Sequence, residues 1–107
     1  MPLVPIKLYR GNDETLPIFS LLDSGADTVI MPRFAAEGIG IADITKGQLR
    51  TTLGVGGNAT EVYYFDDIEI QLVGDSRRLP LPIGFINNQS GKMVPPLLGR
   101  SFFEHFR

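Results

Sequence analysis

The sequence consists of short apolar, β-branched runs separated by Gly, Asn, Asp and Pro, and this pattern favours a mostly β domain. Residues 4–9 and 16–22 are expected strands, joined by a turn at residues 11–13. A brief strand is expected at residues 28–31. Pro32 then fits the first position of a short helix that ends near Gly38.

The second half of the chain continues this pattern around one glycine-rich segment. Residues 48–53 and 60–64 flank Gly54-Val55-Gly56-Gly57-Asn58, which predicts a hairpin. The glycine spacing does not match a dinucleotide-binding loop, and no helix pattern follows it. The other expected elements are a strand that alternates through residues 68–72, a turn at 74–76, a proline-interrupted strand at 79–86 and a helix at 100–106.

Length and composition narrow the functional classes. The 107 residues fit one domain, 1–107, and a net charge of −2 gives no reason to expect binding to nucleic acid or to an anionic membrane. The absence of cysteine excludes disulfides and thiolate chemistry. His105 is the only histidine, which argues against a histidine-built zinc site and a serine–histidine mechanism. With no signal peptide or membrane span, the expected compartment is the cytoplasm.

The segment that points to chemistry is Leu22-Asp23-Ser24-Gly25-Ala26, where a hydrophobic strand runs directly into an acidic residue. Asp, Ser and Gly are all common in β-turns, so a turn without any catalytic role is the simplest interpretation of these residues alone. Only the other sequence elements of the chain can support a catalytic role for this motif.

Three elements together resemble the retropepsin family of aspartic proteases. The first is the Asp-Ser-Gly-Ala tetrad at residues 23–26, and the second is the glycine-rich segment at 54–57, which resembles the family's flap. The third is Leu97-Leu98-Gly99-Arg100, an apolar pair followed by Gly-Arg and a short helix. These elements occur in the family's order, and the resemblance covers about residues 3 to 106. It implies an all-β fold, a closed β-barrel with a flap hairpin and short helices.

The resemblance also implies an aspartic endopeptidase that works as a homodimer on extended peptides, without a metal or an organic cofactor. Such enzymes use two adjacent carboxyl groups that share one proton, and pepsin-like relatives carry two Asp motifs in one chain. This chain carries one, so Asp23 of each subunit would supply half of the pair. At ~3 Å and an effective dielectric of about 20, two full negative charges would repel by roughly 5 kcal/mol, so one carboxyl group keeps its proton and activity is expected at mildly acidic pH.

The resemblance assigns supporting roles around Asp23. The hydroxyl of Ser24 would bond across the dimer, Gly25 would let the substrate backbone approach, and Asp27 would pair with Arg100. Two unrelated surface charges are the alternative for that pair. The residues expected to support the active-site loop are Ser24, Gly25, Ala26, Asp27 and Arg100. The residues expected to contact substrate are Gly25, Asp27, Ile30, Gly54, Val55, Gly56 and Leu97, with Leu21 as a further wall residue or a core residue.

Two alternatives remain open at this stage, along with one departure from the family. A retropepsin-like module could bind peptides or dimerise without cutting them, or an unrelated β-barrel could use Asp23 only for a turn. Many retropepsins also continue into a C-terminal strand that helps to join the dimer, whereas this sequence ends at Arg107. We therefore expect a longer parent chain, a dimer held differently or a weak dimer.

Overall fold

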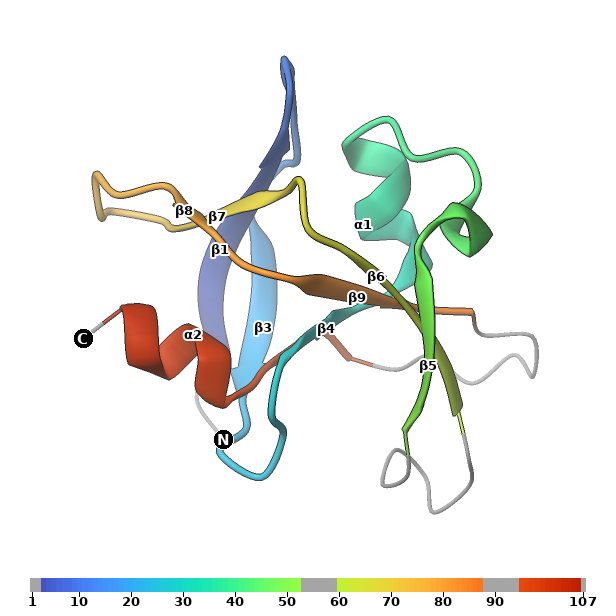
Figure 1. Cartoon of the computed structure of the whole chain (residues 1–107). Coiled ribbons are helices and arrows are strands. Elements are labelled where there is room, and N and C mark those ends of the chain that lie inside the picture. Colours follow the sequence, from blue (N-terminus) through green and yellow to red (C-terminus); the bar gives the residue numbers. More distant parts are fainter. Residues whose placement is uncertain (1–2, 53–59, 88–94, 107) are drawn as a thin grey trace.

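The computed structural model describes residues 3–52, 60–87 and 95–106, and these residues form a mostly β domain with two short α-helices (Figure 1). The elements in chain order are β1 (Leu3–Arg10), β2 (Asp13–Glu14), β3 (Ile18–Leu22), β4 (Val29–Met31), α1 (Arg33–Gly38), the 3-10 turn η1 (Ile44–Lys46), β5 (Gln48–Thr52), β6 (Thr60–Phe65), β7 (Glu69–Leu72), β8 (Leu79–Pro80), β9 (Ile83–Ile86), β10 (Leu97–Leu98) and α2 (Arg100–His105).

The local sequence patterns explain most of these elements. Along β1, Ile6 and Leu8 are fully buried while Lys7 between them points outward, as expected for a strand with one buried face. Gly11 makes the following turn with φ of 59°, a conformation that glycine adopts at little cost. Pro32 precedes α1, as predicted, and the helix ends at Gly38. The proline-interrupted strand is also confirmed, because β8 and β9 stand on either side of residues 81–82.

The strands form one sheet of ten, in the order β5-β6-β9-β4-β10-β3-β1-β7-β8, with β2 paired to β1. The expected closed barrel is wrong for the part of the chain described, because β5 and β8 lie at the two ends of the order and do not pair. One physical reason lies in β8, which has two residues. Pro80 within it and Pro82 just after it lack the N–H groups that a further strand would need.

The central strands are buried on both faces, since alternate residues enter two separate clusters. Val29, Met31 and Phe85 belong to the main core, which also packs against α1 and α2. Ile30 and Val62, with Ile86, form a smaller cluster on the opposite face. The short apolar runs of the sequence therefore match strands that have no solvated face.

The two α-helices pack against different central strands. α1 contacts β9, and α2 contacts β10 and β4 (Figure 1). Phe102 of α2 is buried and stacks on Phe106, with ring centroids 4.7 Å apart. No helix within the described ranges is long and apolar enough to cross a membrane.

Candidate active site

Asp23 lies at the carboxyl end of β3, where a segment from far later in the chain holds its backbone. β10 runs parallel to β3, and the N–H of Asp23 donates to the carbonyl of Leu98 at 3.0 Å. Two residues earlier, the N–H of Leu21 donates to the carbonyl of Pro96 at 2.8 Å. The position of Asp23 is therefore fixed by tertiary contacts as well as by its own strand.

The loop after Asp23 folds back onto its carboxylate. The N–H of Gly25 donates to Oδ1 of Asp23 at 2.9 Å, and the N–H of Ala26 donates to the Asp23 carbonyl at 3.1 Å. Asp23 itself is half-buried, whereas Ser24 and Gly25 are exposed. Among the described residues, Oδ2 of Asp23 has no hydrogen-bond partner, so this oxygen is available to a water or a second carboxyl group.

The outer side of this loop packs on Gly99, which precedes α2. A Cβ atom at Gly99 would lie 2.4 Å from the Thr28 carbonyl oxygen and 2.6 Å from the Ala26 carbonyl oxygen, closer than real Cβ atoms approach. The absence of a side chain lets the N–H of Arg100 reach the Ala26 carbonyl at 2.8 Å. The Gly-Arg pair is therefore a clamp on the loop that begins at Asp23.

The contact that the sequence predicts between Asp27 and Arg100 is present as an ion pair. The carboxylate of Asp27, through its hydrogen bond, raises the pKa of the Arg100 guanidinium above its usual value. Both side chains are mostly exposed, at 74% and 63%, so solvent screens the pair and its contribution to stability is small. A stronger link between the two segments is the backbone bond from Ser101 N–H to the Asp27 carbonyl, at 3.0 Å.

The apolar residues expected along the substrate cleft share one face of the sheet. Leu97 of β10 stands directly opposite both Leu21 of β3 and Ile30 of β4. Ile30 in turn lies opposite Gly84 of β9, and Gly84 lies opposite Tyr64 of β6, so these residues form one row across neighbouring strands. Gly54, Val55 and Gly56, the expected flap residues, lie outside the described residues.

Sequence reasoning missed the far end of this row. Gly84 is a glycine inside a strand, a signal for close approach by another group. A Cβ atom there would lie 2.8 Å from the Tyr64 ring, so the ring occupies the space above the glycine. Tyr64 joins the cluster around Ile30 and Leu97, and its hydroxyl lies 2.8 Å from the Thr28 hydroxyl.

Within the described ranges, no group of three or more His, Asp or Glu side chains is arranged to hold a metal ion. No protein-family model matches the chain, and no curated protein matches it significantly.

Proposed function

We propose that this chain is a retropepsin-type aspartic endopeptidase that acts as a homodimer, with Asp23 of each subunit forming the catalytic pair. The observation that carries the proposal is the loop at Asp23. Leu98 holds the backbone of Asp23 from one side, Gly25 holds one carboxylate oxygen, and the other oxygen has no partner among the described residues. A carboxylate held in this way suits proton transfer, because its orientation is fixed before substrate arrives.

The chemistry follows from two such carboxyl groups sharing one proton. The ionised carboxylate takes a proton from water, whose oxygen attacks the peptide carbonyl carbon, while the protonated partner donates its proton to the carbonyl oxygen. The resulting tetrahedral diol collapses when the C–N bond breaks and a proton passes to the leaving nitrogen. The overall reaction adds one water across one peptide bond.

An apolar surface beside Asp23 supports association with a second copy. Leu3 stands opposite Leu21, two residues before Asp23, and its side chain is 57% exposed. Phe19, on the same strand face as Leu21, is 60% exposed. Burying both side chains in a twofold interface would remove apolar area from water and bring the two Asp23 loops together.

The test is cleavage of a diverse peptide mixture between about pH 4 and 7, followed by mass spectrometry. Cuts made by the wild type and absent with Asp23→Asn are the expected result. Asn keeps the oxygen that accepts the Gly25 N–H but cannot act as the acid or base, so the loop should survive the substitution. No cuts with either protein, at concentrations where a dimer is present, would refute the proposal.

A mixing experiment tests the homodimer. If subunits exchange freely, an equal mixture of wild type and Asp23→Asn contains about one quarter wild-type dimers by random pairing. Activity should therefore fall to about a quarter of that of the same total amount of wild type. Activity that simply halves would show that each chain acts alone.

The same proteins separate an enzyme from a silent peptide-binding module. A silent module would bind peptides equally well with Asp23 or Asn and would release no products with either. Product formation that depends on Asp23 is incompatible with that alternative.

A further inference from the structure

A pocket of about 580 Å³ lies at the Tyr64 end of the cross-strand row that contains Leu21, Leu97 and Ile30. It continues past Tyr64 to Phe65, which packs against the main core. It begins at Thr28, two residues before Ile30 on the same chain, and extends over the ends of β5 and β6. Its walls are largely charged or polar, unlike the row of apolar residues beside Asp23. Three cations and two carboxylates line it, together with Gln48, Tyr64 and other residues.

At the centre of the pocket, Gly84, the Tyr64 ring and the Arg50 guanidinium are stacked in that order. The Tyr64 ring lies over Gly84, and the guanidinium carbon of Arg50 lies 5.4 Å from the ring centroid. This cation–π contact holds the guanidinium in place without consuming its N–H donors. The Tyr64 and Thr28 hydroxyls share one hydrogen bond of 2.8 Å, so one of their two hydroxyl hydrogens remains available to another acceptor.

Of the three cations in the pocket wall, Arg50 is the one that lies over the Tyr64 ring. Arg10 is paired with Asp67 at 3.0 Å, and Lys46 lies near Asp43, where it helps to lower the pKa of that carboxyl after the hydrogen bonds from Thr45. Neither Lys46 nor Arg50 forms a salt bridge within the described part of the chain.

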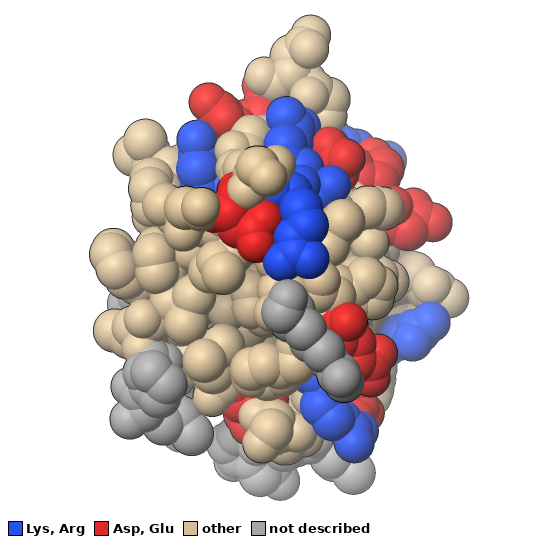
Figure 2. Space-filling view, turned by 90° about the vertical axis from the view of Figure 1, so that its left-hand side faces the viewer, with Lys and Arg blue, Asp and Glu red and all other residues tan. Residues whose placement is uncertain are grey.

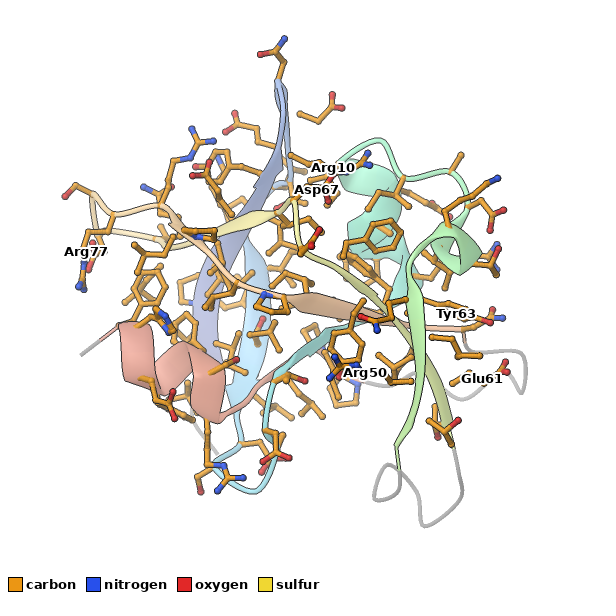
Figure 3. All side chains as sticks on the ribbon, in the orientation of Figure 1. Arg10, Arg50, Glu61, Tyr63, Asp67 and Arg77 are labelled. Carbon is orange, nitrogen blue, oxygen red and sulfur yellow. The ribbon has the colours of Figure 1, made fainter. Side chains whose placement is uncertain are left out.

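The nearest carboxylate on the neighbouring strand does not neutralise Arg50. Glu61 stands opposite Thr51, so it projects from the other face of β6, whereas Arg50 stands opposite Val62. Figure 3 shows Arg50 and Glu61 on opposite sides of the β5–β6 pair. Of the two carboxylates in the pocket wall, Asp67 is paired with Arg10, and Asp66 would oppose an incoming anion.

We propose that this pocket is a specificity subsite that binds the side-chain carboxylate of an Asp or Glu residue in an extended peptide substrate. This inference rests on the proposed function, and it assigns that enzyme a substrate class: peptides with apolar residues at the scissile bond and an acidic residue further along. Arg50 supplies a charge-assisted, two-pronged contact to the carboxylate, and the free hydroxyl hydrogen of the Tyr64–Thr28 pair supplies a third.

The sheet sets the distance between the two parts of the cleft. Tyr64 is four strands away from Leu21, and neighbouring strands lie about 4.8 Å apart, which places the pocket at most about 19 Å along the sheet. An extended peptide covers that distance in about six residues at roughly 3.3 Å each. The acidic residue therefore lies several positions from the cleaved bond, within about six.

The test compares acetylated and amidated peptides, so that the only carboxylate is a side chain. In a library cut by the wild type, one position within about six residues of the cut should favour Asp and Glu over Asn and Gln by about fivefold, as for a partly exposed ion pair. Arg50→Gln should remove this preference, and Arg50→Glu should replace it with a preference for Lys and Arg. Arg78→Gln is the matched control, because Arg78 pairs with Glu69 on another part of the surface.

Binding to Asp23→Asn protein keeps this inference separate from the proposed activity. Titration calorimetry with matched Glu and Gln peptides should show about fivefold tighter binding of the Glu peptide, and Arg50→Gln in the same background should equalise the two. Cleavage that depends on Asp23 without any acidic preference would overturn the subsite and leave the protease proposal standing. Equal binding of the Glu and Gln peptides, whether or not cleavage occurs, would also overturn it.

Discussion

Asp23 and Asp75 begin two turns that are locally alike and chemically different. The carboxylate of Asp23 accepts the N–H of Gly25 at 2.9 Å, and the carboxylate of Asp75 accepts the N–H of Arg77 at 2.8 Å. Both are the Asp turn in which a side chain bonds the backbone two residues later. Both residues therefore begin a turn, as the sequence indicates, and the turn by itself does not distinguish them.

The difference lies in the remaining donors around each carboxylate. The Arg77 guanidinium donates to both oxygens of Asp75, with Nε 3.0 Å from Oδ1 and Nη2 2.8 Å from Oδ2, and these hydrogen bonds lower the pKa of Asp75 to about 2. Figure 2 looks onto the side of the molecule that carries this β7–β8 turn, where Lys and Arg atoms lie beside Asp and Glu atoms. Asp75 thus has its charge satisfied within its own turn.

Asp23, by contrast, has its backbone fixed and one carboxylate oxygen left without a partner among the described residues. Leu21, two positions earlier on the same strand face, lies opposite Leu97, and Asp23 forms no salt bridge among the described residues. The comparison shows that two features make the Asp23 turn a candidate catalytic site. A distant strand fixes its backbone, and one carboxylate oxygen has no partner among the described residues.

The largest expected effect is a difference in peptide cleavage between the Asp23 and Asp75 variants. Asp23→Asn should lower peptide cleavage by about 10³-fold or more, because general acid–base catalysis is lost. Asp75→Asn should leave cleavage unchanged at pH 5 to 6, since its turn lies outside the proposed site. Initial rates on one fluorogenic peptide measure both. Equal losses in the two variants would remove the distinction between the turns.

The second effect concerns the clamp on the Asp23 loop. Gly99→Ala should destabilise the fold by about 3 kcal/mol, because its Cβ would overlap backbone oxygens that have little freedom to move. Gly74→Ala, beside Asp75, meets no atom within 4 Å and should cost about 1 kcal/mol through its positive φ of 97°. Urea unfolding at pH 7 compares them. A smaller loss at Gly99 than at Gly74 would contradict the clamp.

The third effect is a pH dependence of stability that belongs to Asp75. Its folded pKa of about 2 lies below its ordinary value of 3.8, so the unfolded chain binds more protons between these values. The stabilisation from the Asp75–Arg77 contacts is present above about pH 4 and is lost as the pH falls toward 2. The difference in thermal midpoint between wild type and Asp75→Asn should therefore shrink from pH 5 to pH 2. A constant difference would show that Asp75 stabilises the turn without its charge.

The smallest effect is expected for the exposed ion pair at the edge of the Asp23 loop. Asp27→Asn and Arg100→Gln should each lower the unfolding midpoint slightly, and the double variant should lose less than their sum. Added salt should weaken this coupling, because the charges are exposed. Coupling that is large and independent of salt would show that the pair, rather than Gly99, is the main clamp.

Most strands could be predicted from local sequence, because each shows either alternating apolar and polar residues or a short apolar run between turn residues. The strand predicted at 16–22 begins two residues later in the structure, at Ile18, because Leu16 and Pro17 are exposed. The closed barrel could not be predicted correctly, because closure depends on whether the two edge strands meet. The contact of Asp27 with Arg100 was predicted from the family resemblance, whereas nothing local in the sequence joins them.

The sequence by itself determined the strands, the turns and the presence of one Asp-Ser-Gly motif, because these depend on residue types within a few positions of one another. The tertiary structure alone decided that Leu98 and Gly99 fix the Asp23 loop and that Gly84, Tyr64 and Arg50 stack into a pocket. These contacts join strands that are distant in the chain, and their register is set by packing across the whole sheet.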